Sequence, residues 1–108
     1  MSINIQQMMQ QAQQMQEKLK SMQERIGNMV VEGTSGGGSV AVQMTCKGTL
    51  ESIKIADSLI APDEKEMLED LIVAACNDAR SKADQTMTAE TQKMMEEMGL
   101  PSNMQLPF

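Results

Sequence analysis

The sequence predicts an α+β fold in which two long helices flank a three-stranded antiparallel sheet. Apolar residues recur at helical spacing towards both ends of the chain, whereas a central stretch alternates apolar and polar residues. Short glycine-containing connections separate the alternating runs. A chain of 108 residues has room for one domain, which we expect to span residues 1–98, with a mobile tail at 99–108.

The first predicted helix covers residues 5–29, where apolar side chains recur at alternating intervals of three and four. This spacing places them at the a and d positions of a heptad repeat, a narrow stripe that packs against one other helix. Gly27 and Asn28 provide a stop signal. The stripe, called the seam below, consists of Ile5, Met8, Ala12, Met15, Leu19, Met22, Ile26 and Met29.

Three short strands are expected in the middle of the chain. A β-branched run at 29–32 is followed by a glycine-rich run at 33–39, which we interpret as a flexible hairpin loop. Residues 40–46 alternate like a half-buried strand, and a turn at Gly48 leads to a third strand at 50–56. The short connections indicate an antiparallel meander, and so small a sheet needs a helix over one face.

The second long helix is predicted from Pro62 to Met98. Proline at the first position and an acidic first turn fit a helix start, and Asp63 with Glu66 predicts a capping box. A helix of this length measures about 55 Å, so its far half must project beyond the sheet or meet a partner. Its apolar stripe contains Met67, Leu68, Leu71, Ile72, Ala75, Ala79 and Ala83.

The predicted core has no large aromatic anchor. The chain contains 13 Met but one aromatic residue, Phe108, so Met is expected to fill much of the core volume. Methionine specifies packing loosely. A thin core and a helix seam without a partner together predict a homodimer.

Several classes of function are disfavoured by the residues that are missing. The chain has no His, and it contains neither a nucleophile elbow nor a Walker loop. Cys46 and Cys76 fit buried, reduced thiols better than a disulfide or a metal site. We therefore expect no enzyme activity, cofactor, metal or small-molecule substrate. Without a signal peptide or a membrane-length apolar stretch, the expected location is the cytosol.

The charge distribution leaves room for nucleic acid although the net charge is −6. Residues 1–29 carry a net charge of +1 (three basic, two acidic), and the remaining residues carry −7 (six basic, thirteen acidic). Beside the seam runs a second stripe whose members donate hydrogen bonds and include no acid, which suits phosphate contacts. An ordinary solvated helix face is the alternative interpretation. This donor stripe consists of Gln7, Gln11, Gln14, Lys18, Ser21 and Arg25.

The assembled pattern resembles the YbaB/EbfC family of bacterial nucleoid-associated proteins. Several motifs match in order and spacing, and Cys76 departs from the aliphatic residue that members often have there. The matching segments are the core of the first helix Met-Met-Gln-Gln-Ala-Gln-Gln-Met-Gln-Glu-Lys-Leu, Gly36–Gly38 before Val40–Thr45, Gly48 before Ile53–Ile55, the run Asp63–Ala79, and Gly99–Pro101.

The resemblance implies an α-β-β-β-α protomer that dimerises through its sheet, with projecting helices that bind duplex DNA with little sequence preference. Positions implicated in DNA contact fall on both helices. They correspond to Lys18, Lys20 and Arg25 on the first helix and to Arg80 and Lys82 on the second. The residues add Gln11 and Gln14 of the donor stripe as candidates. A second hypothesis is an adaptor that binds replication or recombination proteins.

Overall fold

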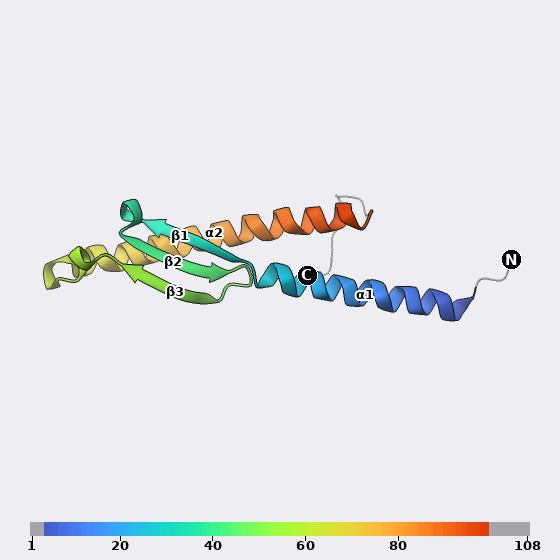
Figure 1. Cartoon of the computed structure of the whole chain (residues 1–108). Helices are drawn as coiled ribbons and strands as arrows, with labels where there is room; N and C mark the ends of the chain where they lie inside the picture. The colour runs from blue at the N-terminus through green and yellow to red at the C-terminus, as the bar shows by residue number, and fades with distance from the viewer. Residues whose placement is uncertain (1–3, 100–108) are drawn as a thin grey trace.

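The computed structural model describes residues 4–99 and shows the element order α-β-β-β-α (Figure 1). Helix α1 (Ile5–Gly27) leads into strands β1 (Val30–Ser35), β2 (Val40–Thr45) and β3 (Leu50–Ile55), and helix α2 (Lys65–Glu97) follows. The sheet has the order β1-β2-β3 with both pairs antiparallel, so the predicted α+β fold is confirmed. Apart from Gly99, the predicted tail lies outside the described residues.

The molecule is elongated, with principal extents of 78 × 22 × 17 Å. Helix α2 crosses one face of the sheet and continues past it, and α1 leaves the same end of the sheet (Figure 1). The parts of α1 and α2 beyond the sheet are called the arms below. The prediction that the second helix is too long for the sheet and must project is therefore confirmed.

The core lies between α2 and the first two strands. Two alanines of α2 with no exposed surface allow the helix to lie close to the sheet. Met44 is the single methionine in this cluster, but Met94 and Met95 of α2 are also buried, so methionine supplies part of the buried volume while Val, Leu and Ala form most of the cluster on the sheet. Several methionines instead lie on the surface, among them Met8, Met9, Met15 and Met67. The cluster consists of Val40, Val42, Met44, Leu59, Ala75 and Ala79.

Gly33 belongs to strand β1, not to the predicted loop. It pairs with Val42 at the point where α2 comes closest to the sheet. A Cβ atom at this position would overlap the carbonyl oxygen of Ala75 and the amide nitrogen of Ala79, and would lie 2.6 Å from the Ala79 Cβ. Glycine therefore lies in a strand here because the helix backbone occupies the side-chain position.

The hairpin loop between β1 and β2 contracts to a tight turn at Gly36–Gly38, closed by a 3.3 Å hydrogen bond from the N–H of Ser39 to the carbonyl of Gly36. These glycines have φ values of 60°, 67° and 96°, in the left-handed region that other residues adopt at a cost. The conformational requirement of a tight turn accounts for the glycine run, as predicted for a hairpin connection.

Helix α2 begins at Lys65, after a separate 3-10 turn at Pro62–Glu64. The predicted capping box of Asp63 and Glu66 is wrong, because the N-cap residue is Glu64 and it makes no side-chain hydrogen bond to the helix. The N–H of Glu64 already donates to the carbonyl of Ala61 within the 3-10 turn. At 55% exposed, Met67 also lies outside the buried stripe predicted for it.

Candidate nucleic-acid interface

The donor stripe of α1 is solvent-exposed along its whole length. All six of its side chains are classed as exposed, as is Lys20 on the neighbouring row. Among the described residues, Lys18, Lys20 and Arg25 take part in no ion pair. The helix that carries them begins at an Asn4 cap, whose side-chain oxygen accepts from the N–H of Gln6 at 3.1 Å. The predicted donors are thus unoccupied and displayed on a regular helix.

Part of this stripe borders the space between the two arms. Gln11, Gln14 and Lys18 line a shallow depression together with Glu97 and Met98 at the end of α2. The α1 side of the depression carries the amides and the ammonium group, and the α2 side carries a carboxylate. An anionic ligand would therefore be attracted to α1 and repelled by the tip of α2.

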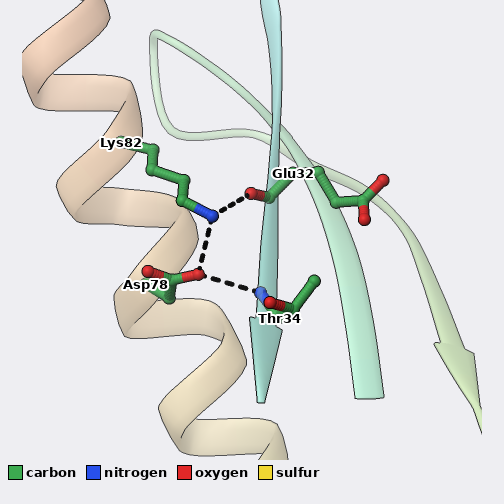
Figure 2. Close-up of polar contacts among 4 residues, drawn as sticks. All are labelled: Glu32, Thr34, Asp78 and Lys82. Atoms are coloured by element: carbon green, nitrogen blue, oxygen red, sulfur yellow. Dashed lines mark hydrogen bonds and ion pairs between the residues drawn. The ribbon is translucent and has the colours of Figure 1, made fainter. Parts of the chain in front are cut away.

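The candidate residues of α2 have partners within the protein. Lys82 Nζ lies 3.0 Å from Asp78 Oδ2 and donates a 3.0 Å hydrogen bond to the carbonyl of Glu32. Asp78 Oδ2 also accepts from the N–H of Thr34 at 2.9 Å (Figure 2). We call Asp78 and Lys82 the β1 clasp. It satisfies one donor and one acceptor on the outer edge of β1 and fastens α2 to that edge.

The clasp lowers the pKa of Asp78 below its ordinary value, first through the hydrogen bond from the Thr34 N–H and then through Lys82. Because the folded state favours the ionised carboxylate, its contribution to stability is complete above the unfolded pKa of about 3.9. The contribution disappears as the pH falls through the lowered folded-state pKa. Asp78→Ala is therefore expected to lower the thermal unfolding midpoint at pH 7, with a deficit that shrinks steadily below about pH 4.

Asp84→Ala is the matched control for this measurement, because Asp84 pairs with Arg80 at 3.4 Å on an exposed surface of the same helix. The control should change the midpoint little at any pH. A deficit of Asp78→Ala that stays constant down to about pH 2 would mean that lost packing, and not the ionised carboxylate, causes it.

A basic residue that the sequence did not single out lies at the base of α1. Lys47 in the turn between β2 and β3 donates a 3.1 Å hydrogen bond to the Asn28 side chain. A Cβ atom on the adjacent Gly48 would lie 3.2 Å from Arg80 Nη1, so Arg80 reaches this same turn. A lysine in a tight turn belongs to no periodic stripe, which explains why spacing alone did not reveal it.

The cysteines and acidic residues form no reactive centre in the described part of the chain. Burial, assisted by the nearby charge of Glu90, raises the pKa of the Cys46 thiol, which favours the protonated form. Cys46 is buried as expected, whereas Cys76 is only half-buried. Residues 4–99 contain no cluster of three potential metal-ligating side chains, and neither long helix is apolar enough to span a bilayer.

This geometry defines an α+β protein with two long helices that project beyond a three-stranded antiparallel sheet (Figure 1). Comparison with known proteins agrees: the model of the YbaB/EbfC DNA-binding family matches residues 1–98, and the chain belongs to that family. The family description and the names of the relatives below indicate a DNA-binding protein, not an enzyme.

Two relatives illustrate the likeness. A nucleoid-associated protein of Bradyrhizobium sp. (strain ORS 278) is 52% identical over 94 residues, which cover 87% of this chain and 89% of that protein. A nucleoid-associated protein of Rhodospirillum centenum is 46% identical over 105 residues, 97% of this chain and 98% of its own. In fold, the chain is similar to the uncharacterized protein HP0035 of Helicobacter pylori, with a TM-score of 0.67, 22% identity, and coverage of 87% and 99% of the two chains.

Proposed function

We propose that this protein is a homodimeric, nucleoid-associated protein that binds duplex DNA with little sequence preference and compacts it. The observation that carries the proposal is the exposed donor stripe of α1, which has no acidic member, in a chain of a DNA-binding family. The primary contacts are assigned to Gln11, Gln14, Lys18, Lys20 and Arg25. Arg80 and Lys82 have a secondary role, because Lys82 would have to give up its clasp bonds to reach a phosphate.

Binding by an acidic protein requires that the contact surface be separated from most of the acidic charge. The segment 65–97 that forms α2 carries four basic and eight acidic residues, a net charge of −4, whereas α1 carries +1. Charges are largely screened beyond a Debye length of about 10 Å at 0.1 M salt. The projecting α1 therefore presents the positively charged segment of the chain to the phosphates, whereas Glu97 at the tip of α2, which borders Gln11, Gln14 and Lys18, opposes binding on that side.

Little sequence preference follows from the chemistry of the donors. Gln, Ser, Lys and Arg side chains hydrogen-bond phosphate oxygens, and every nucleotide carries the same phosphate group whatever its base. The chain has no Trp or Tyr and one Phe, so stacking on bases is poorly served. Contacts to the backbone and to the shape of the groove therefore account for binding.

The homodimer is supported by an apolar strip on the sheet that α2 leaves open. Helix α2 packs on β1 and β2, while Leu50 and Ile53 of β3 remain 45% and 42% exposed. These residues pair with Met44 and Val42, which are buried, so they lie on the same face of the sheet as the core. A second copy that covers this strip would extend the core and place two pairs of arms in one particle.

The test is a titration of the full chain with random-sequence duplex at several salt concentrations, with its mass in solution measured by light scattering. We expect a mass near twice 11.9 kDa and an affinity that survives scrambling of the duplex sequence. The log–log salt slope should be about −0.9 for each phosphate neutralised. Absence of binding at low salt, or binding that salt leaves unchanged, would contradict the proposal. A stoichiometric protein partner without any duplex affinity would instead favour an adaptor.

A further inference from the structure

We propose that the free end of α1 is a self-association site, at which the α1 helices of two copies of this chain pair in antiparallel orientation. The site goes beyond DNA binding and does not depend on it. It consists of the seam residues Ile5, Met8, Ala12 and Met15, which we call the seam tip.

Within residues 4–99, which the structure describes, the seam tip has no partner. Towards the base of α1 the seam is covered, since Ile26 is 2% exposed and Leu19 and Met22 are half-buried. Exposure then rises steadily towards the free end, from 47% at Met15 through 55% at Met8 to 71% at Ile5. Gln11 and Met15 lie across from Met98, so α2 ends at this level and α1 continues past it (Figure 1).

The spacing of the seam-tip residues indicates which type of secondary structure can pack on them. Intervals of three, four and three residues keep the side chains on the narrow stripe that a second α-helix fills by knobs-into-holes packing. A flat apolar surface or an extended strand would not match this geometry. The occupant is therefore a helix with a heptad spacing of its own.

The charge pattern favours another copy of this chain as the source of that helix. Two molecules with a net charge of −6 repel each other over most of their surfaces. Residues 1–16 carry no charged side chain, and Glu17 is the first charged residue of the sequence. Two copies can therefore approach along this segment without repulsion between charged side chains. The polar positions around the seam tip are mostly Gln, and the Gln side chains of two copies can hydrogen-bond to each other.

In antiparallel pairing, every seam-tip residue of one copy faces a seam-tip residue of the other. When the two helices cross at position 10, Ile5 faces Met15 of the second copy and Met8 faces its Ala12, so the small residue of the seam tip lies next to the crossing opposite a large one. The helix dipoles then oppose each other favourably, and the two acidic α2 helices lie on opposite sides of the crossing. Parallel pairing would instead bring the two acidic α2 helices together.

Four seam residues per copy make a short interface, so a single pairing is weak. Coiled coils are recognised by apolar heptads sustained over three to four repeats, about twice this length. Pairing strengthens when molecules are held close together, because a tethered encounter acts at a high effective concentration. Copies bound side by side on one duplex meet this condition, and their free α1 ends would then link neighbouring particles.

Disulfide trapping tests both the pairing and its orientation. Met8→Cys and Ala12→Cys proteins are mixed at high concentration without DNA and oxidised mildly, and the linked tryptic peptides 1–18 are identified by mass. We expect the mixed product, in which a Met8→Cys chain is linked to an Ala12→Cys chain, to exceed either homogeneous product several-fold. Dominance of links between two chains of the same variant would overturn the antiparallel arrangement, and the absence of linked 1–18 peptides would overturn the site. Links from the introduced thiols only to Cys76 would show that another surface covers the seam tip.

Sedimentation equilibrium of uncharged variants provides the second measurement. Met8→Gln with Met15→Gln should weaken the association of dimers into larger assemblies at least tenfold. The control, Gln6→Ala with Gln13→Ala on the opposite face of α1, should leave this association unchanged. Equal association of both variants would overturn the proposal. The Met8/Met15 variant should still bind a short duplex, so failure of the self-association site and failure of DNA binding give different results.

Discussion

Gly33→Ala is expected to leave the protein largely unfolded under conditions in which the unchanged chain is folded. The new Cβ would occupy space already taken by the backbone of α2 at Ala75 and Ala79, and backbone atoms cannot move aside as the end of a side chain can. Overpacking of side chains costs about 1–3 kcal/mol. A clash with a helix backbone that must lift from the sheet should exceed about 4 kcal/mol, much of the total stability of a small domain.

Denaturant unfolding followed by circular dichroism measures this effect, and Gly38→Ala is the matched control. A Cβ on Gly38 meets no atom within 4 Å, although its φ of 96° makes any side chain there costly by about 1–2 kcal/mol. The control should therefore show a modest shift of the midpoint. If Gly33→Ala were no more destabilised than Gly38→Ala, the close approach of α2 to β1 would be contradicted.

Combined replacement of Lys18, Lys20 and Arg25 by Ala is expected to reduce duplex affinity by about 10²-fold at 0.1 M salt. Each phosphate contact contributes about 0.9 to the salt slope, so loss of three contacts lowers the magnitude of the slope by about 2.7 for each protomer that contacts the duplex. Folding should be preserved, because all three side chains are exposed and take part in no ion pair among the described residues. Fluorescence anisotropy with a labelled duplex measures both the affinity and the slope.

Lys54→Ala with Lys65→Ala is the control, because it removes positive charge from exposed positions outside α1. Comparison of the loss of affinity per charge removed separates a local contact surface from a general effect of net charge. Equal losses per charge would contradict the assignment to α1. A loss confined to the α1 variant would support it and leave Arg80 and Lys82 as the next positions to replace.

The order of elements could be predicted from the sequence because periodicity records which side of each element is buried. Val40, Val42, Met44 and Cys46 alternate in sequence, and all four are buried in the structure. The three alanines at 75, 79 and 83 were placed on the inner face of α2 by the same reasoning, and each has no exposed surface. Family resemblance added the expectation of a sheet-mediated dimer, which spacing alone did not provide.

Features that depend on contacts between distant elements could not be predicted in this way. Gly33 looks like part of a loop in the sequence, since only the approach of α2, more than forty residues later, explains its place in β1. The capping box failed for a similar reason, because a 3-10 turn at Pro62–Glu64 precedes the helix and moves the N-cap position from Asp63 to Glu64. Met67 fits the helical stripe by spacing, yet it remains 55% exposed because no described element packs over it.

For the same reason, the sequence anticipated the exposure of the α1 residues of the candidate site but not the tertiary contacts of Lys82. The donor stripe of α1 is a property of one helix, and its exposure agrees with the spacing argument. Lys82 was selected as a free cation, but its partners Asp78 and the Glu32 carbonyl come from α2 and from a strand fifty residues earlier in the chain. Whether a basic side chain is free for a ligand thus depends on tertiary contacts that spacing does not encode.

Because the connection between α1 and β1 is short, a small rotation at the base of α1 displaces the far end of this long helix. The N–H of Lys47 donates to the carbonyl of Gly27, and the N–H of Cys46 donates to the carbonyl of Met29, so the base of α1 is bonded to the end of β2 and its turn. From this bonded base α1 extends roughly 34 Å. A rotation of only a few degrees at the Lys47–Gly48 turn would sweep the far end of the helix through several ångströms, so a residue far from any ligand can control where that end points.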